Sequence, residues 1–247
     1  MGESLTILVP RYNEENCIQQ LVLEMNKFLD RVTIRTEVLF INDGSKDKSL
    51  DLIEDICLYD SRYSFISLEK NEGLSTALKA GIDYCTSTLI GYMDADLQTS
   101  PSDFLKLLPY MQECDLATGY RVNRKDTVVK KLSSTIANSF RRQLLHDNII
   151  DIGCPMKMIR ADLAKQMFFF KGMHRFIPDI VTLLAGKVKQ VPIQHFPRYA
   201  GKAKYHLFNR LFGPFIDVIV FRWMQRHAIR YHILKHSMNL YDEELAR

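Results

Sequence analysis

Short runs of apolar residues alternate with longer amphipathic stretches from the amino terminus to about residue 111. The runs are rich in β-branched and aromatic residues and predict buried strands. They lie at residues 5–9, 37–41, 65–68 and 87–93. In the stretches between them, apolar residues recur every three or four positions, which predicts helices. These lie at residues 13–29, 46–59, 75–85 and 101–111. The alternation predicts an α/β fold with a mostly parallel sheet flanked by helices.

Polar loops follow three of these strands, at residues 10–15, 42–45 and 94–98. Because the strands of a parallel sheet end at the same edge, we expect the loops to converge on one crevice. Such a crevice suits a nucleotide, since amides at helix starts bind phosphate and Asp43 can accept hydrogen bonds from a base or ribose. Neither a Walker loop nor a dinucleotide-binding glycine pattern is present.

The loop Asp94-Ala95-Asp96-Leu97-Gln98 carries the most specific chemistry of the three. Two carboxylates at the end of a buried strand suit a hard divalent cation, which prefers oxygen ligands. A cation there would neutralise a diphosphate as it leaves a substrate. An isolated Asp-x-Asp is more often an acidic, solvated turn, so the assignment depends on the surrounding motifs.

Composition narrows the function classes. The chain has 247 residues, of which 47% are hydrophobic and 25% charged, as expected for one globular α/β domain. Its net charge of +4 is too small to indicate nucleic acid as a partner. Five scattered cysteines argue against a zinc site or a disulfide framework and fit a reducing compartment. We expect neither a signal peptide nor a membrane span, because no window holds 18 apolar residues in a row.

The motifs occur in an order that resembles family 2 glycosyltransferases with the GT-A fold, and within them the polyprenyl-phosphate glycosyltransferases. The resemblance covers about residues 4–206 and depends on the order of the motifs, since each one is weak alone. The matching positions are Pro10, Tyr12, Asn13, Glu14, Asn42-Asp43-Gly44-Ser45, Asn71, Gly73, Ala77, Gly81, Asp94-Ala95-Asp96-Leu97-Gln98, Pro101, Gly119-Tyr120-Arg121, Arg124, Asp126, Asp151, Gly153, Cys154, His174-Arg175-Phe176, Pro178, Arg198, Gly201, Lys202, Lys204 and Tyr205. Two positions depart from the family pattern, with Ala203 in place of a serine and Asn42 in place of an aspartate.

The resemblance implies an inverting, metal-dependent enzyme that moves a sugar from a GDP- or UDP-linked donor to a polyprenyl (dolichyl or undecaprenyl) phosphate. It implies that the donor is bound by Pro10, Tyr12, Glu14, Asp43, Asn71, Gly73, Asp94, Arg198 and Lys204. It assigns Mg2+ or Mn2+ to Asp94, Asp96 and Gln98. It assigns the acceptor phosphate to Arg121, Lys130, Arg198 and Lys202. The catalytic set is then Asp94, Asp96 and Arg121.

The residues themselves leave the acceptor open. A phosphate acceptor is already ionised near neutral pH and needs cations rather than a general base. A sugar hydroxyl in cell-surface glycan synthesis would need a base, for which Asp151 is the best candidate. A structural acceptor of backbone hydrogen bonds explains Asp151 equally well. The third alternative is a non-catalytic nucleotide-sugar-binding subunit of a membrane complex.

Residues 207–247 differ from the catalytic domain, which we place at residues 1–206. Arg222, Arg226 and Arg230 recur at four-residue spacing, with Trp223 among apolar neighbours. This pattern is typical of a basic amphipathic helix on a membrane surface. A helix packed on the domain or on a sister subunit would explain the pattern equally well. The polar ending 241–247 suggests a natural terminus. We therefore expect a peripheral protein at the cytoplasmic face of a membrane, with a membrane-protein partner or as a homo-oligomer.

Overall fold

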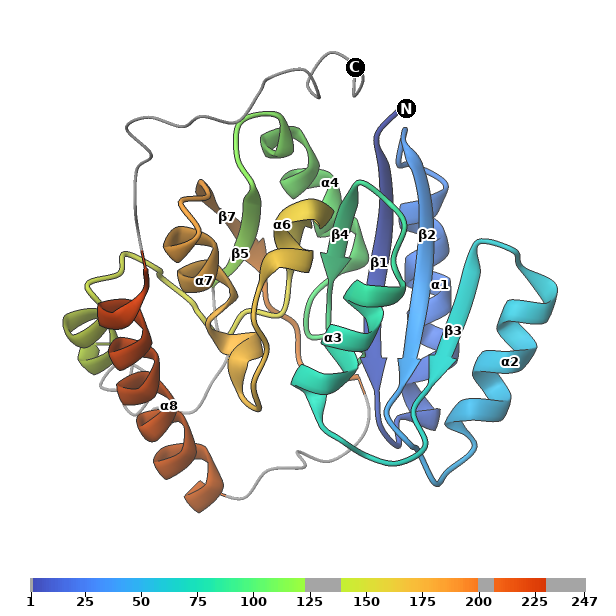
Figure 1. Ribbon diagram of the computed structural model, residues 1–247. Helices are drawn as coiled ribbons and strands as arrows, with labels where there is room; N and C mark the ends of the chain where they lie inside the picture. Colours follow the sequence, from blue (N-terminus) through green and yellow to red (C-terminus); the bar gives the residue numbers. More distant parts are fainter. Residues whose placement is uncertain (1, 123–138, 200–206, 230–247) are drawn as a thin grey trace, which may run out of the picture.

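A computed structural model describes residues 2–122, 139–199 and 207–229, and its centre is a seven-stranded sheet (Figure 1). The strands lie in the order β3-β2-β1-β4-β6-β5-β7. All neighbours pair in parallel except β6, which is antiparallel to both β4 and β5. The mostly parallel α/β fold is therefore confirmed. The strand bounds are β1 Ser4–Arg11, β2 Arg35–Asn42, β3 Tyr63–Ser67, β4 Leu89–Tyr92, β5 Leu116–Val122, β6 Lys157–Arg160 and β7 Val188–Gln194.

Helices cover both faces of the sheet and enclose two hydrophobic cores. Alternate side chains of β1 point to opposite faces, so Ile7 and Val9 join one core and Leu8 joins the other. The first core is closed by α1 (Ile18–Leu29), α2 (Ser49–Tyr59) and α4 (Phe104–Leu107). The second is closed by α3 (Leu74–Tyr84), α6 (Ala161–Gln166), α7 (Ile177–Leu183) and α8 (Leu207–His227). The remaining helical segments are short 3-10 turns at Glu15–Cys17, Pro101–Asp103, Leu108–Gln112 and Met173–Arg175, and a helix over residues 139–145.

Two predicted helices differ from the observed ones for local reasons. The single helix predicted over 101–111 is wrong, because it is divided into a 3-10 turn, the four residues of α4 and a second 3-10 turn. Pro109 lies in the last of these and cannot donate the backbone hydrogen bond that would continue an α-helix. The helix predicted from residue 13 begins only at Ile18, because Asn13 has a left-handed backbone (φ 49°). The basic and apolar residues of 132–146 predict an amphipathic helix; of these, residues 139–146 are described, and 139–145 form a helix.

Helix α8 joins the domain through one of its faces. Val218 and Phe221 are buried in the second core, where the Phe221 ring stacks on Phe176 with 5.0 Å between centroids. Asp217 pairs with Arg175 at 3.3 Å. Among the helices of the described residues, none is long and apolar enough to cross a bilayer.

Candidate functional site

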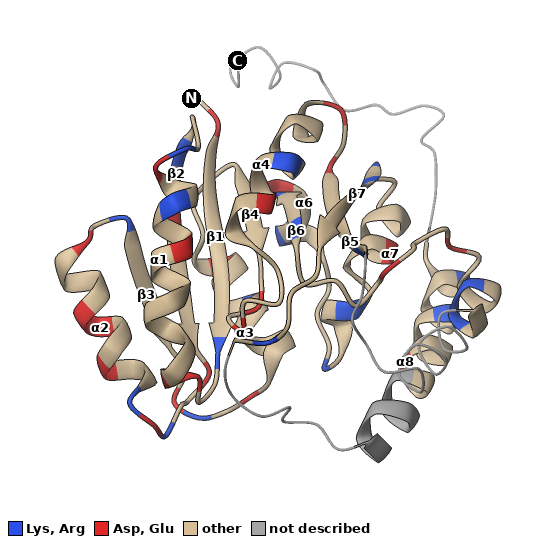
Figure 2. Cartoon of the chain, turned by 180° about the vertical axis from the view of Figure 1, so that it is seen from behind, with Lys and Arg blue, Asp and Glu red and all other residues tan. Residues whose placement is uncertain are grey.

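The polar loops that follow β1, β2 and β4 meet at one edge of the sheet, as the topology predicts. Arg11 at the end of β1 pairs in register with Asn42 at the end of β2, and Leu8 pairs with Tyr92 at the end of β4. Figure 2 shows acidic and basic residues gathered along this edge. The predicted convergence of these loops at one edge is therefore confirmed.

Asp43 connects the loop after β2 with the loop between β3 and α3. Its side chain is buried, and its Oδ1 accepts a hydrogen bond from the Glu72 amide at 2.8 Å. Its Oδ2 accepts from the Gly73 amide at 3.0 Å and from Asn71 Nδ2 at 2.9 Å. Burial raises the pKa of Asp43, whereas the two amide hydrogen bonds oppose that shift. Gly73 has a φ of 90°, a conformation that glycine adopts without strain.

A cavity of about 290 Å³ opens beside Asp43. Five of the residues predicted to bind the donor line it, and the lining is Pro10, Arg11, Tyr12, Asp43, Asn71, Gly73, Leu74 and Ala77. The volume lies just below the range typical of ligand pockets, roughly 300–1,000 Å³. The lining thus comes from the end of β1, from the three loops that follow β1, β2 and β3, and from the start of α3.

Asp94 and Asp96 follow the end of β4. Asp94 accepts a hydrogen bond from the Tyr92 hydroxyl at 2.7 Å, and Asp96 is only 7% exposed. Burial and then the charge of Asp96 raise the pKa of Asp94 to about 6. A divalent cation beside Asp94 would lower this pKa, because the cation favours the ionised carboxylate.

The ligands available from the protein fit a cation that takes much of its coordination from water and substrate. Within the described segments, no three His, Cys, Asp or Glu side chains form a metal cluster. A cation on Asp94 and Asp96 would therefore need oxygen ligands from Gln98, water and a diphosphate. Mg2+ is commonly held in this way, by one or two carboxylates together with substrate phosphates.

The segment Phe196–Tyr199 lies against the Asp96–Gln98 turn. The Phe196 amide donates to the Gln98 carbonyl at 3.0 Å, and the Tyr199 amide donates to the Asp96 carbonyl at 3.3 Å. Arg198 Nη2 lies 2.9 Å from Asp96 Oδ2, and its Nη1 lies 3.9 Å from Glu14 Oε1. Arg198 thus connects a predicted donor residue with a predicted metal ligand.

Arg121 and Asp151 form a two-pronged ion pair. Arg121 Nε donates to Asp151 Oδ2 at 2.7 Å, and Nη2 donates to Oδ1 at 2.9 Å. The Arg121 backbone amide donates to Oδ2 as well, at 3.2 Å. Burial lowers the pKa of Arg121, but the contacts with Asp151 outweigh it and hold the pKa above its usual value. Of the two explanations for Asp151, this geometry favours the structural acceptor.

Lys157 is a functional candidate that the motifs did not indicate. Its side chain is 2% exposed, it pairs across the sheet with Tyr92, and its Nζ donates to the Cys154 carbonyl. The ammonium lies 5.9 Å from the centre of the Tyr92 ring, whose hydroxyl holds Asp94. Burial lowers the pKa of Lys157, and the nearby Cys154, Asp151 and Asp94 oppose that shift. The sequence feature that could have indicated Lys157 is its position as a single lysine within the apolar run 154–159.

Other predicted residues lie outside this geometry. Lys130, Lys202 and Lys204 are not among the described residues.

His174 has a structural contact, since its Nδ1 lies 2.9 Å from Ser75 Oγ, and burial lowers its pKa to about 3. It is therefore neutral at physiological pH.

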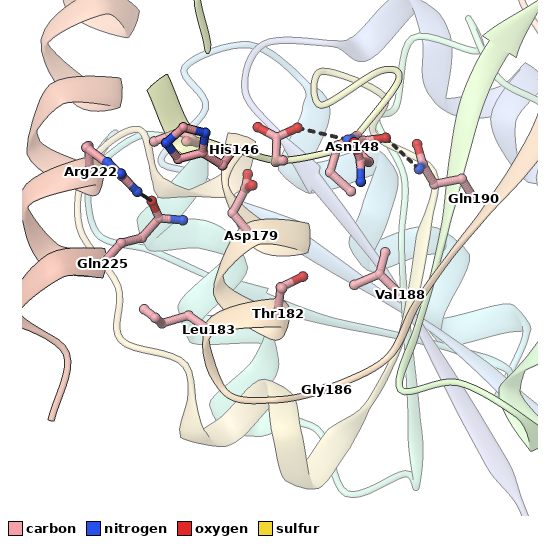
Figure 3. A pocket seen from close by; sticks show the side chains of 13 residues that line it. His146, Asn148, Asp179, Thr182, Leu183, Gly186, Val188, Gln190, Arg222 and Gln225 are labelled. Carbon is pink, nitrogen blue, oxygen red and sulfur yellow. Dashed lines mark hydrogen bonds between the residues drawn. The ribbon is translucent and has the colours of Figure 1, made fainter. Parts of the chain in front are cut away.

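A second cavity of about 510 Å³ lies between the loop 145–149, α7 and α8 (Figure 3). It shares no lining residue with the cavity beside Asp43. Asp179 points toward this loop and is 3% exposed, and its Oδ2 has no hydrogen-bond partner within the described part of the chain. Burial, and secondarily the charge of Asp147, raise its pKa to about 7. No sequence motif indicated this cluster.

Comparison with known proteins gives a consistent result. The family model described as glycosyl transferase family 2 matches residues 6–168. The chain is 30% identical over 232 residues to dodecaprenyl-phosphate galacturonate synthase of Rhizobium johnstonii, covering 92% of this chain and 68% of that protein. It is 28% identical over 219 residues to undecaprenyl-phosphate 4-deoxy-4-formamido-L-arabinose transferase of Salmonella choleraesuis, covering 88% of this chain and 67% of that protein.

Among solved structures, the chain resembles glucosyl-3-phosphoglycerate synthase of Mycobacterium tuberculosis, crystallised with Mn2+, UDP-glucose and phosphoglyceric acid. The TM-score is 0.68 at 14% identity, covering 93% of this chain and 81% of that one. At this identity the likeness establishes the fold, which is the GT-A fold.

Proposed function

The chain belongs to glycosyl transferase family 2, and from that membership we propose that it transfers a sugar from a nucleotide-sugar donor to the phosphate of a polyprenyl lipid. Both relatives are named for a sugar joined to a polyprenyl phosphate, dodecaprenyl phosphate in one and undecaprenyl phosphate in the other. The observation that carries the proposal is the pairing of Asp151 with Arg121. This pairing supports a role for Asp151 in orienting an arginine, and an arginine suits an anionic acceptor.

We propose that the crevice holds the donor with the base beside Asp43 and the diphosphate between the loops of β1 and β4. Asp94, Asp96 and Gln98 would hold Mg2+ or Mn2+, which would neutralise the charge of the departing diphosphate. Arg198 would bond the diphosphate from the other side. The three lysines outside the described residues remain assigned as predicted, Lys204 to the donor and Lys130 and Lys202 to the acceptor phosphate.

In the proposed reaction, an oxygen of the acceptor phosphate attacks the anomeric carbon while the bond from that carbon to the donor diphosphate breaks. The bonding pair leaves on the diphosphate, and the configuration at the anomeric carbon inverts. No proton must be removed, because a phosphate monoester is mostly ionised at pH 7. Arg121, held in one orientation by Asp151, would bring this anion against the donor.

We also propose that residues 207–247 attach the catalytic domain to a membrane. One face of α8 leaves large apolar side chains 44–61% exposed, namely Phe215, Ile216, Ile219, Val220 and Trp223. Arg222 and Arg226 lie on the same helix. An apolar stripe with arginines suits the surface of an anionic bilayer, where the acceptor resides. The described cysteines are free thiols, which suits the cytoplasmic face.

The test is donor turnover with a lipid acceptor. The protein is incubated with a panel of UDP- and GDP-sugars, Mg2+ or Mn2+, and undecaprenyl or dolichyl phosphate in detergent. We expect release of nucleoside diphosphate that requires both metal and lipid phosphate. Asp96→Ala should abolish release, whereas the matched control Asp83→Asn, at an exposed ion pair on α3, should not.

Other outcomes would refute the proposal. Transfer to a sugar hydroxyl without lipid dependence would identify a glycan-extending enzyme. Donor binding without turnover, whatever the acceptor, would identify a non-catalytic subunit.

A further inference from the structure

The Asp96 carboxylate that we propose as a metal ligand is bonded on both oxygens. Its Oδ1 accepts a hydrogen bond from the Gln98 amide at 3.1 Å, and its Oδ2 pairs with Arg198 Nη2 at 2.9 Å. The Asp96 side chain is 10% exposed and that of Arg198 is 30% exposed, so water screens the pair only in part. A divalent cation that binds Asp96 must therefore compete with a guanidinium for the same oxygen.

We infer that Arg198 makes the donor site selective for the metal–diphosphate complex over the free divalent cation. This inference rests on the proposed function, because it assumes a metal at Asp96 and a diphosphate beside it. It adds a specific role for Arg198, which is to disfavour the cation until the nucleotide arrives.

The reason is the exchange of one anion for another. A free cation at Asp96 would repel Arg198 and leave its guanidinium without that partner. A diphosphate between the loops of β1 and β4 offers Arg198 a new anion, which an arginine bonds through two parallel N–H groups. The loss of the Asp96–Arg198 ion pair is therefore offset when the diphosphate binds with the cation, but not when the cation binds alone. By linkage, the nucleotide must also bind more tightly when the cation is present.

Arg198 is positioned to make this exchange with its side chain alone. The neighbouring amides of Phe196 and Tyr199 are held by the carbonyls of Gln98 and Asp96, and neither bond involves the guanidinium. The backbone therefore keeps Arg198 beside the turn when its side chain turns away from Asp96. On its other side, Nη1 lies 3.9 Å from Glu14 Oε1, so the guanidinium already spans the two loops.

The test measures Mn2+ binding to the full chain by the electron paramagnetic resonance signal of free Mn2+, alone and with UDP or GDP. Arg198→Gln removes the charge, and Arg198→Lys keeps the charge but loses the two parallel N–H groups. Arg160→Gln is the control, at a partly exposed ion pair with Asp115. For Arg198→Gln we expect free Mn2+ to bind about 10-fold more tightly than in the wild type. The same variant should bind the Mn2+–nucleotide complex about 10-fold more weakly. Arg198→Lys should fall between the two, and Arg160→Gln should match the wild type.

Unchanged or weaker binding of free Mn2+ by both Arg198 variants, each with a wild-type melting curve, would overturn the inference. Asp96→Ala separates this failure from that of the proposed function. If Asp96→Ala abolishes Mn2+ binding while the Arg198 variants match the wild type, only the role of Arg198 is wrong. If Asp96→Ala leaves Mn2+ binding intact, or the wild type binds neither Mn2+ nor nucleotide, the metal site itself is wrong and both proposals fail.

Discussion

Replacement of Asp151 by asparagine distinguishes a lipid-phosphate acceptor from a sugar-hydroxyl acceptor. Asp151 and Arg121 are 9% and 16% exposed, and three N–H groups of Arg121 converge on the carboxylate. Removing one partner of a buried ion pair costs about 3–5 kcal/mol. Asparagine keeps one acceptor oxygen, so we expect Asp151→Asn to lower the free energy of unfolding by roughly 2 kcal/mol.

The kinetic effect should fall on the acceptor. Asp151 orients Arg121, so its loss should raise the KM for lipid phosphate about 10-fold, equivalent to about 1.4 kcal/mol. The Kd of the donor and the pH dependence of kcat should stay as in the wild type, because Asp151 transfers no proton. The assay follows nucleoside diphosphate release against lipid concentration between pH 6 and 9. Asp83→Asn is the control.

A different result would show that Asp151 is a general base. In that case kcat would fall by about 10²–10⁴, the acceptor KM would hardly change, and the acid limb of the pH profile would disappear. A double-mutant cycle with Arg121→Gln adds a second criterion. If Asp151 acts through Arg121, the double variant should be no worse than Arg121→Gln alone.

Three further predictions concern stability and membrane binding. Burial raises the pKa of Asp179 from 3.8 to about 7, so its ionisation destabilises the folded state as the pH rises through that interval. In urea unfolding, Asp179→Asn should therefore raise the free energy of unfolding by up to roughly 4 kcal/mol at pH 8 and by little at pH 4. Equal gains at both pH values would contradict this. Trp223→Ser, at 61% exposure, should weaken sedimentation with anionic vesicles while leaving the melting temperature unchanged; unaltered sedimentation would refute a membrane role for this face. Gly44→Ala should destabilise the fold by more than about 1 kcal/mol in the same urea assay, because φ is +65° and the new Cβ would meet the Lys70 backbone carbonyl carbon; unchanged stability would contradict it.

Periodicity and turn residues predicted most of the fold, because strand and helix patterns are encoded over short stretches of chain. The order of strands and helices through residue 111 was predicted correctly, apart from the boundaries and the divided helix at Pro109. The strand ends converge in any parallel sheet, which is why the sequence alone places Asp43 and Asp94 at the same edge. Resemblance to the family added Arg121 and Arg198, whose roles no local pattern could supply.

The sequence by itself determined which chemical groups the crevice contains. Only the tertiary structure decided how those groups pair, because pairing depends on strand register and on contacts between distant segments. Asp96 and Arg198 are separated by about a hundred residues, yet the backbone bonds of Phe196 and Tyr199 bring them to 2.9 Å. The sequence left two interpretations of Asp151, and the two hydrogen bonds from Arg121 to its oxygens favour the structural one. Only the tertiary structure also shows that Lys157 and Asp179 are buried, because burial depends on how the whole chain packs.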